Sequence, residues 1–330
     1  MSLAYLGIDI SKTTVDVALL RDDQELVRGQ FKNDAKGFAQ LGRWLKKRRC
    51  AQVHACMEAT GHYWLNIARY LHEAGHLVSV VNPKLIKRHS EAIMQRNKTD
   101  RQDAWTIGDY GRKHQPPLWQ PPAEAWWRLR ALVRHVQALK TDRTRERNRR
   151  QSGIAAAEVL TAIDAHIAFL DEQIDDLEGQ IRDHIDNHPD LKRNRDLLLS
   201  IPGIGETTAA AFLAELPDAS LFSQARQVAA FAGLTPGQRQ SGTSLNKPGR
   251  LVKWGNARLR TAFFMPALSA HRYNPLIAAY RERLLARGKA KMTVVIAVMR
   301  KLLHLCYGVI KTGKPFDPNY GNLQPILLDI

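Results

Sequence analysis

A change in periodicity near residue 120 sets the strongest limit on what this chain can fold into. The first hundred residues alternate short apolar runs, typical of strands, with stretches whose apolar residues recur at helical spacing. A proline cluster at 116–122 then breaks the pattern, and beyond it no strand signal recurs. The change predicts an α/β domain over 1–122, a helical segment over 123–195 and a mainly helical domain over 196–330.

The alternation in the first part predicts a mixed sheet flanked by helices. Three β-rich runs that follow one another closely can pair as a meander, and the later runs alternate with helices as in βαβ units. We expect strands over 3–10, 14–20, 25–31, 51–58 and 76–81, and helices over 37–48 and 62–74.

The charge of the chain is strongly unbalanced. The 330 residues hold 49 Lys and Arg against 32 Asp and Glu, a net charge of +17 that is spread through the sequence rather than gathered in a tail. This balance is too basic for a typical metabolic enzyme, and it indicates a polyanionic partner, foremost a nucleic acid.

The cysteines and the apolar runs bear on the cellular compartment. Cys50, Cys56 and Cys306 form no CxxC pair and suggest no disulfide framework, so a reducing cytoplasm fits. The sequence opens on a strand pattern rather than a signal peptide. No apolar run approaches the roughly 18–20 residues that span a bilayer, so no membrane segment is expected.

The segment 123–195 carries a heptad pattern. Its leucines and isoleucines alternate spacings of three and four residues over three repeats, which favours a coiled coil and a dimerisation element. An amphipathic helix that packs on its own domain is the alternative. A dense basic run at 140–150 precedes it and is either a solvated face or a face that follows phosphates. The heptad positions are Leu160, Ile163, Ile167, Leu170, Ile174, Leu177 and Ile181.

Four acidic residues stand where strands end or a helix begins. Asp9 and Glu58 each close an apolar strand, where an unpaired buried carboxylate is costly. Asp100 and Asp103 lie three residues apart, which places both on one face of a helix start. Taken singly, Asp100 could cap the helix and Asp103 could suit its dipole. As a set, the four predict an oxygen-ligand Mg²⁺ site of the kind used in phosphoryl transfer.

The stretch 197–216, LLLSIPGIGETTAAAFLAEL, has the pattern of a helix-hairpin-helix. Gly203 and Gly205 permit a tight turn, and the second helix begins at Glu206 with Thr207 in its first turn. A phosphate could reach the backbone N–H groups there, so the motif would bind nucleic-acid backbone without reading bases. The alternative is a plain pair of packed helices.

The segment 237–260 is basic and contains no acid, and two glycines predict that it is loop-like. Such a loop is usually only a nucleic-acid contact. Ser241 and Ser244 in its middle allow a second interpretation, because guanidinium groups around a serine stabilise the charge that develops when its hydroxyl attacks a phosphodiester. The basic residues are Arg239, Lys247, Arg250, Lys253, Arg258 and Arg260.

These pieces, in this order, resemble a known family. The acids Asp9, Glu58, Asp100 and Asp103 match the acid order of RuvC-like domains of the RNase H fold. Together with RNKTDRQDA, IPGIGETTA, FAGLTP and RQSGTS, the chain resembles the DEDD insertion-sequence transposases related to the Piv invertase, which are bridge-RNA-guided serine recombinases. The resemblance covers essentially the whole chain.

The resemblance implies a fold and a mechanism. The fold would be a RuvC-like RNase H-fold domain, then an α-helical coiled-coil segment, then a mainly helical transposase domain with a helix-hairpin-helix. The four acids would hold Mg²⁺, with Mn²⁺ as a substitute. Ser241, which precedes Gly242 in the family's Ser-Gly motif, would form a phosphoserine bond to DNA.

The resemblance also implies partners. These are donor and target double-stranded DNA and a structured noncoding guide (bridge) RNA that pairs with both. The protein would be a tetramer, a dimer of dimers, in which each active site combines halves from two protomers. We expect it in the bacterial cytoplasm, associated with the nucleoid and not with a membrane.

Three other readings compete with the recombinase. A RuvC-like Holliday-junction resolvase or nuclease would use the four acids with water as nucleophile. A sugar-kinase-like or actin-like ATPase is suggested by GIDISKTTVDVALL, although the second half offers no adenosine site. A non-catalytic RNA-binding or architectural protein would need only the charge and the helical hairpin.

Overall fold

The computed structural model describes residues 3–21, 26–59, 61, 63–94, 99–154, 156–216, 218–241, 245–252 and 254–319. For residues 100, 101, 220, 238–241, 245–250 and 252 it describes the backbone alone. The chain divides into two compact units, Met1–Pro121 and Pro122–Ile330. Both helical parts that the sequence separates at residue 195 lie in the second unit, and the division between them stays a prediction.

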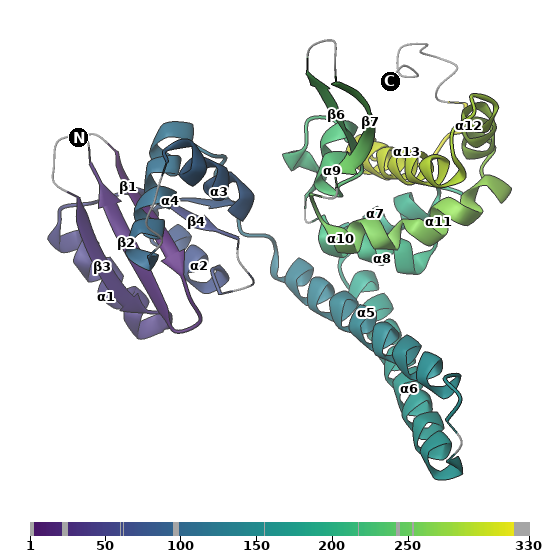
Figure 1. Ribbon diagram of the computed structural model, residues 1–330. Helices are drawn as coiled ribbons and strands as arrows, with labels where there is room; N and C mark the ends of the chain where they lie inside the picture. The colour runs from purple at the N-terminus through teal and green to yellow at the C-terminus, as the bar shows by residue number, and fades with distance from the viewer. Residues whose placement is uncertain are drawn as a thin grey trace. The chain divides into compact units, whose positions relative to one another are not determined.

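The first unit contains a five-stranded sheet in the order β3-β2-β1-β4-β5 (Figure 1). The strands β1, β2 and β3 form an antiparallel meander, whereas β1, β4 and β5 run parallel. The predicted mixed sheet is therefore confirmed. The strands are β1 (Ala4–Ile10), β2 (Thr14–Leu20), β3 (Val27–Lys32), β4 (Val53–Glu58) and β5 (Leu77–Val81).

Helices cover both faces of this sheet. Alternate residues of β1, such as Leu6 and Ile8, share a core with α1 (Ala35–Lys47) and α2 (Leu65–Glu73). The other face is covered by α3 (Pro83–Ala92) and α4 (Asp100–His114).

The second unit begins with a helical hairpin, which continues into a compact helical body (Figure 1). The hairpin consists of α5 (Glu124–Arg150) and α6 (Ala157–Asp186). The body contains α7 (Pro189–Leu199), α8 (Glu206–Glu215), η1 (Ala219–Leu221), α9 (Ala225–Phe231), β6 (Thr235–Ser241), β7 (Leu245–Val252), α10 (Ala257–Ala262), α11 (Phe264–Ser269), η2 (Ala270–Arg272), α12 (Pro275–Ala286) and α13 (Lys291–Thr312).

The helix α13 corrects one expectation. Its 22 residues are long and apolar enough, by length and composition alone, to cross a membrane, although the sequence was expected to contain no such run. Arg300 and Lys301 interrupt the run, so the sequence shows no unbroken apolar stretch of that length. Leu302, Leu303 and Cys306 are buried in the core of the second unit, and 44% of the apolar stretch of this helix is buried.

The heptad seam packs inside the chain. Ile163, Leu170, Ile174 and Ile181 on α6 are buried, and α6 runs alongside α5 (Figure 1). This is the alternative that the sequence left open, a helix packed on its own domain. A heptad pattern indicates that a helix has a partner but does not say whether that partner is in the same chain. A coiled coil between chains therefore stays a prediction.

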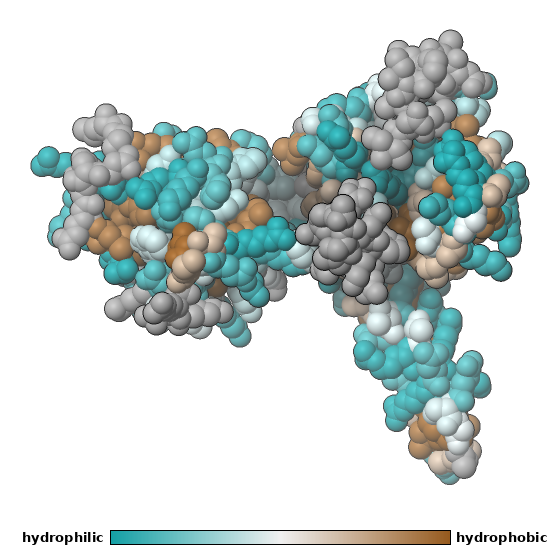
Figure 2. Space-filling model, turned by 45° about the horizontal axis from the view of Figure 1, so that its top comes forward, coloured by the Kyte–Doolittle hydropathy of each residue, from teal (hydrophilic) through white to brown (hydrophobic). Residues whose placement is uncertain are grey.

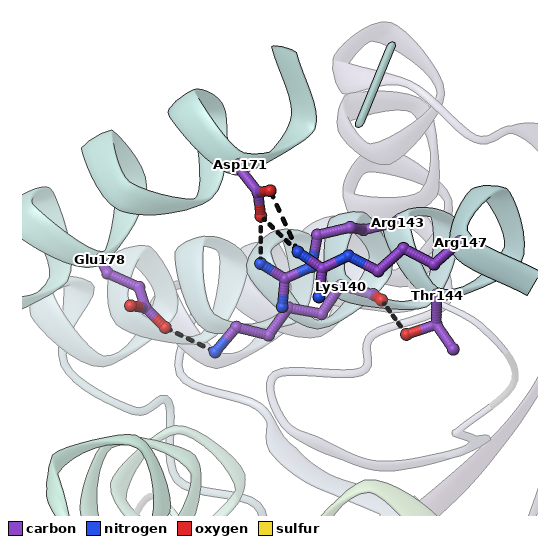
Figure 3. Close-up of polar contacts among 6 residues, drawn as sticks. All are labelled: Lys140, Arg143, Thr144, Arg147, Asp171 and Glu178. Carbon is purple, nitrogen blue, oxygen red and sulfur yellow. Dashed lines mark hydrogen bonds and ion pairs between the residues drawn. The ribbon is translucent and has the colours of Figure 1, made fainter. Parts of the chain in front are cut away.

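The basic run at 140–150 is partly neutralised by α6. Lys140 Nζ lies 2.5 Å from Glu178 Oε1, and Arg147 Nη2 lies 3.1 Å from Asp171 Oδ2 (Figure 3). Arg143 pairs with the same Asp171. These cations brace the helical hairpin, which weakens the interpretation of the run as a face that follows phosphates.

The segment expected to be a loop is a β-hairpin. β6 and β7 pair antiparallel from Thr235 opposite Val252 to Ser241 opposite Leu245, with one irregularity between Gly237 and Arg239. The expectation that no strand follows the prolines was therefore wrong. The ladder is built by backbone groups of mostly polar residues, so the apolar alternation that marks a strand is missing.

Candidate active site

The sheet brings two of the predicted acids together. β1 and β4 are parallel neighbours in a register that pairs Ile8 with Met57, so Asp9 and Glu58 come next on the two strands. Neighbouring strands lie about 4.8 Å apart, and the carboxyl ends of parallel strands meet at one edge of a sheet. The backbone N–H of Ile10 donates to Asp9 Oδ1 at 3.0 Å. Both acids are half-buried, as suits groups that face a ligand.

The helix α4 passes over β1 next to Asp9. A Cβ at Gly7 would lie 2.0 Å from the carbonyl oxygen of Ala104, so only glycine allows this approach. Asp103 precedes Ala104, and Asp100 lies one turn earlier at the start of the helix. Gly7 and Asp9 point to the same face of β1. The start of α4, which contains Asp100 and Asp103, therefore lies over the face of the sheet that carries Asp9.

The N-cap of α4 is Thr99, whose hydroxyl accepts from the N–H of Gln102 at 3.3 Å. The alternative that Asp100 caps this helix is therefore wrong. The side chain of Asp100 lies outside the described residues, and Asp103 is half-buried.

A buried carboxylate of α4, Asp109, connects this helix to α3. The side chain of Asp109 on α4 is 1% exposed. Its Oδ2 lies 2.9 Å from His89 Nε2 and 2.9 Å from Lys113 Nζ, and its Oδ1 lies 3.1 Å from Arg112 Nη2. Burial alone would raise the pKa of Asp109, but the hydrogen bonds from Lys113, His89 and Arg112 outweigh it and the pKa lies below its usual value. The contact with His89 thus ties the later part of α4 to α3.

The donor set suits a hard divalent cation. Carboxylate oxygens are the ligands that Mg²⁺ prefers. Cys56, beside Glu58, adds no thiolate, because burial and then the charge of Glu58 raise the pKa of its thiol to about 12. Among the side chains that the structure describes, which exclude Asp100, no three metal-binding groups lie close enough to hold an ion. The chemistry of the residues fits Mg²⁺, but the described side chains of Asp9, Glu58 and Asp103 do not by themselves form such a cluster.

The predicted nucleophile lies in the β-hairpin of the second unit. Ser241 is the last residue of β6, Arg239 pairs with Lys247 across the ladder, and Gly237 pairs with Arg250. The backbone therefore brings three basic positions together on one hairpin. The side chains of these residues, and all of Ser244 and Lys253, lie outside the described residues.

The base of this hairpin is tightly clamped. Gly255 has φ +151°, and a Cβ there would lie 2.4 Å from the carbonyl oxygen of Phe231 and 2.5 Å from the nitrogen of Gly233. The N–H of Asn256 donates to the same Phe231 carbonyl at 2.6 Å. Arg260, expected to bind nucleic acid, donates from Nη1 to a backbone carbonyl at 3.0 Å and so helps to hold this base.

The two glycines of the predicted helix-hairpin-helix have different surroundings. Gly203 has φ +98°, and a Cβ there would lie 2.8 Å from the Cβ of Ala270, so this glycine serves the turn and its packing. Gly205 is the N-cap of α8 and has open space around it. An open cavity of about 480 Å³ lies here, with Thr208 and Arg272 among its lining residues. Thr207, in the first turn of α8, is exposed.

Comparison with known proteins decides the family. Residues 6–155 match the family model DEDD_Tnp_IS110, described as a transposase, and residues 195–282 match the transposase IS116/IS110/IS902 family. The chain is 36% identical to the pilin gene-inverting proteins of Moraxella bovis and Moraxella lacunata over 321 residues, 96% of this chain and 98% of theirs. The chain belongs to the IS110 family of transposases. It is also 25% identical to the transposase of insertion sequence IS1328 of Yersinia enterocolitica, over 78% of this chain and 81% of that protein. An IS110-family transposase is an enzyme that processes DNA.

Two residues near the candidate sites of this IS110-family transposase are not predicted from its sequence. Asp16 on β2 lies directly opposite Asp9 in the register and is 5% exposed. Gln30 on β3 donates from Nε2 to both carboxylate oxygens of Asp16, at 3.2 and 3.1 Å. An acid between valines inside the strand TVDVALL is the signal that could have revealed it.

Glu215 at the end of α8 is the second such residue, at 3% exposed. Arg134 of α5 donates to both its oxygens, from Nε at 2.7 Å and Nη2 at 2.8 Å, and Asn256 Nδ2 donates at 2.6 Å. Burial raises the pKa of Glu215, but the hydrogen bonds from Arg134 and Asn256 outweigh it and the pKa is lowered. No local pattern reveals it, because its partners lie far away in sequence.

Proposed function

We propose that this IS110-family transposase cleaves and rejoins donor and target DNA through a phosphoserine bond at Ser241, assisted by Mg²⁺ or Mn²⁺ at Asp9, Glu58, Asp100 and Asp103. The observation that carries the proposal is the adjoining register of Asp9 and Glu58 at one edge of the sheet, with α4 beginning above the same face. The strand order β3-β2-β1-β4-β5, a meander followed by parallel strands, supports an RNase H-like, RuvC-like reading of this unit.

The covalent step exchanges one phosphodiester bond for another, so the number of such bonds stays the same. The Oγ of Ser241 forms a bond to the scissile phosphorus while the bond to the 3′-oxygen breaks, and the serine proton passes to water or a carboxylate. The released 3′-oxygen takes up a proton and becomes a hydroxyl. Attack by a 3′-hydroxyl of another strand then reverses the step, rejoins DNA and frees Ser241.

The surrounding residues have separate tasks in this proposal. Arg239, Lys247 and Arg250 stabilise the charge of the pentacoordinate phosphorane, because fixed cations act strongly where negative charge develops. A bound divalent ion would supply Lewis-acid stabilisation of the attacking and leaving oxygens. The carboxylates orient the phosphate and accept protons.

The proposal includes a guide RNA and an assembly. A structured RNA that pairs with donor and target would leave the protein to bind backbone, and a net charge of +17 supports such binding. The open N-terminus of α8 at Gly205 supports the helix-hairpin-helix reading. In a tetramer, the acids of one protomer would meet the serine of another.

The far end of the α5–α6 hairpin supports an assembly role for this element. Val159, in the first turn of α6, is 37% exposed, and Phe169, further along the same helix, is 55% exposed. In Figure 2 the surface of the helical hairpin is largely hydrophilic, with an apolar patch at its far end. An exposed apolar patch on an otherwise polar surface is typical of a contact with another protein chain.

A second candidate is a RuvC-like resolvase or nuclease that uses water as its nucleophile. The acids at the sheet edge favour it as much as they favour the recombinase, because it needs no serine. The two differ in the fate of the cleaved strand, which carries a protein adduct only in the serine mechanism.

The test purifies the protein with its bound RNA and incubates it with Mg²⁺, cognate RNA and end-labelled donor and target DNA. Denaturing gels then compare the wild type with Ser241→Ala and Ser244→Ala. We expect a protein–DNA adduct in the wild type and in Ser244→Ala but none in Ser241→Ala. Full cleavage by Ser241→Ala, with no adduct in the wild type, would establish the resolvase instead.

A further inference from the structure

Arg130 on α5 is a half-buried cation whose hydrogen-bonding groups are unused. Its Nε has no exposed surface and no hydrogen-bond partner. Its guanidinium lies 4.8 Å from the ring centre of Trp126 and 5.4 Å from that of Trp127. Within the described part of the chain, no carboxylate and no carbonyl accepts from it. An arginine presents five donors, so most of its binding capacity is open.

The nearby carboxylate is already occupied. Arg134 lies one helical turn after Arg130, so both project from one face of α5. The N–H of the Trp126 ring donates to the carbonyl of Leu213 at 2.9 Å, which sets this face against α8. Glu215 on α8 gives both oxygens to Arg134 and one of them also to Asn256. Among the side chains that the structure describes, no second carboxylate pairs with Arg130.

A third arginine stands beside this pair. Arg258 follows two residues after Asn256, which caps α10 and contacts Glu215. Arg258 is exposed, and the described residues offer it no ion pair. Burial is the main cause that lowers the pKa of Arg130 to about 10, and the positive charges of Arg134 and Arg258 contribute to it. The charge of Glu215 opposes this lowering, but its oxygens are already held by Arg134 and Asn256.

We propose that Arg130 and Arg258 form a phosphate-binding site, here called the Arg130–Arg258 site, for a backbone phosphate of the bound nucleic acid. A half-buried cation such as Arg130 is costly unless an anion compensates its charge. Guanidinium groups bind phosphate through paired hydrogen bonds, and stacking on tryptophan leaves their edges available. The site rests on the proposed function only in taking the anion to be nucleic-acid backbone.

The location gives the site a role distinct from catalysis. It adjoins the base of the β6–β7 hairpin, where Gly255 and Asn256 are clamped to α9. Ser241 lies at the other end of β6, about 20 Å from Thr235 at the rise of a strand. The phosphate at this site is therefore not the one that Ser241 attacks. It anchors the nucleic acid at a fixed distance from the reacting bond.

The first test measures anion binding without nucleic acid. Thermal unfolding of the Ser241→Ala protein is compared in sodium pyrophosphate and in sodium chloride of equal ionic strength. The same comparison is made with Arg130→Gln and Arg258→Gln added together. We expect pyrophosphate to raise the Tm of the parent more than that of the double variant. In chloride, the double variant should unfold at the same temperature as the parent or a higher one, because a surplus charge has been removed.

The second test measures nucleic-acid affinity, again with Ser241→Ala, so that its outcome does not depend on the covalent chemistry. We expect the double variant to lose about tenfold in affinity and the slope of log K against log salt to fall by about 1. The matched control is the double variant Arg128→Gln with Arg145→Gln, because it removes an equal charge from exposed positions of α5. It should leave the slope unchanged.

Labelled duplex DNA and the co-purified RNA are tested separately. If the double variant loses affinity for only one of them, that nucleic acid supplies the phosphate. Equal pyrophosphate shifts in parent and double variant, unchanged affinity for both nucleic acids, or a Tm in chloride lowered by several degrees would overturn the proposal. The last result would show that Arg130 only stabilises the packing around Trp126.

Discussion

The carboxylate of Asp16 lies opposite Asp9 in the antiparallel pairing of β1 and β2, on the same face of the sheet. Side chains in such pairs have Cβ atoms about 4.5–5.5 Å apart. Two carboxylates at that spacing repel one another unless a cation or a donor intervenes. The amide of Gln30 donates to both oxygens of Asp16, but a neutral amide leaves the negative charge of Asp16 in place.

Neutralising Asp16 should therefore have two effects of opposite sign. Without divalent metal, Asp16→Asn should unfold at a higher temperature, because repulsion with Asp9 is removed. Its affinity for Mn²⁺ should fall by about tenfold, or about 1.4 kcal/mol, because the field that attracts the ion is weaker. Calorimetric titration with Mn²⁺ and thermal unfolding check the two effects.

Glu73→Gln is the control for Asp16, since it removes an exposed acid from α2, on the other face of the sheet. It should change neither property. Unchanged Mn²⁺ affinity in Asp16→Asn would show that Asp16 plays no part in attracting the ion.

Glu215 predicts a pH dependence of stability. Its folded pKa is lowered, so its ionised form stabilises the fold fully above the ordinary carboxyl pKa, and this stability is lost as pH falls through the lower folded pKa. At neutral pH, Glu215→Gln should lower the free energy of unfolding by about 3 kcal/mol, because Arg134 loses a buried counter-ion. Urea unfolding at neutral and acidic pH checks both statements.

The difference in unfolding free energy between wild type and Glu215→Gln should shrink at acidic pH. Asp190→Asn, which replaces an exposed acid at the start of α7, should show no comparable loss at neutral pH. A difference that stays constant across pH would mean that the charge of Glu215 is not what stabilises the hairpin base.

Gly203 and Gly205 give a matched pair of substitutions. Gly203→Ala should lower the Tm clearly, since its φ is +98° and its new methyl group would meet Ala270. Gly205→Ala should leave the Tm nearly unchanged, because the space around it is open, but should weaken DNA binding by crowding the N-terminus of α8. Thermal unfolding and DNA titration separate these effects. If Gly205→Ala binds DNA normally, the backbone at this turn does not hold a phosphate.

Gly7→Ala tests the placement of α4. The methyl group would overlap the Ala104 carbonyl and push the start of α4, with Asp103, away from Asp9. We expect a lower Tm and weaker Mn²⁺ binding, both seen by thermal unfolding with and without the metal. Gly308→Ala, at an open position on α13, serves as the control for a glycine replacement in the other unit. Normal Mn²⁺ binding by Gly7→Ala would show that binding of the ion does not depend on the close contact between α4 and β1.

The sheet of the first unit could be predicted because its strands are short apolar runs whose order restricts their pairing. β6 and β7 could not, because a ladder of polar residues carries no apolar signal. The acids Asp9 and Glu58 stood out as breaks at strand ends. Asp16 did not, because its position opposite Asp9 depends on register.

Contacts between distant segments were the other gap. Glu215 meets Arg134 and Asn256, which lie 81 and 41 residues away, and no local pattern links them. The heptads of α6 likewise indicated a partner helix, but the hairpin with α5 decides which one. Both cases depend on tertiary packing rather than on the periodicity of a segment.

The central claim is that Ser241 becomes bonded to DNA. The most direct measurement is mass spectrometry of the adduct after nuclease trimming and digestion with trypsin. The peptide from Gln240 to Arg250 contains Ser241, Thr243 and Ser244, and fragmentation separates the three hydroxyl groups. The account predicts a phosphonucleotide on Ser241 and none in Asp9→Asn. A modification on Thr243 or Ser244, or cleaved DNA with no modified peptide, would contradict it.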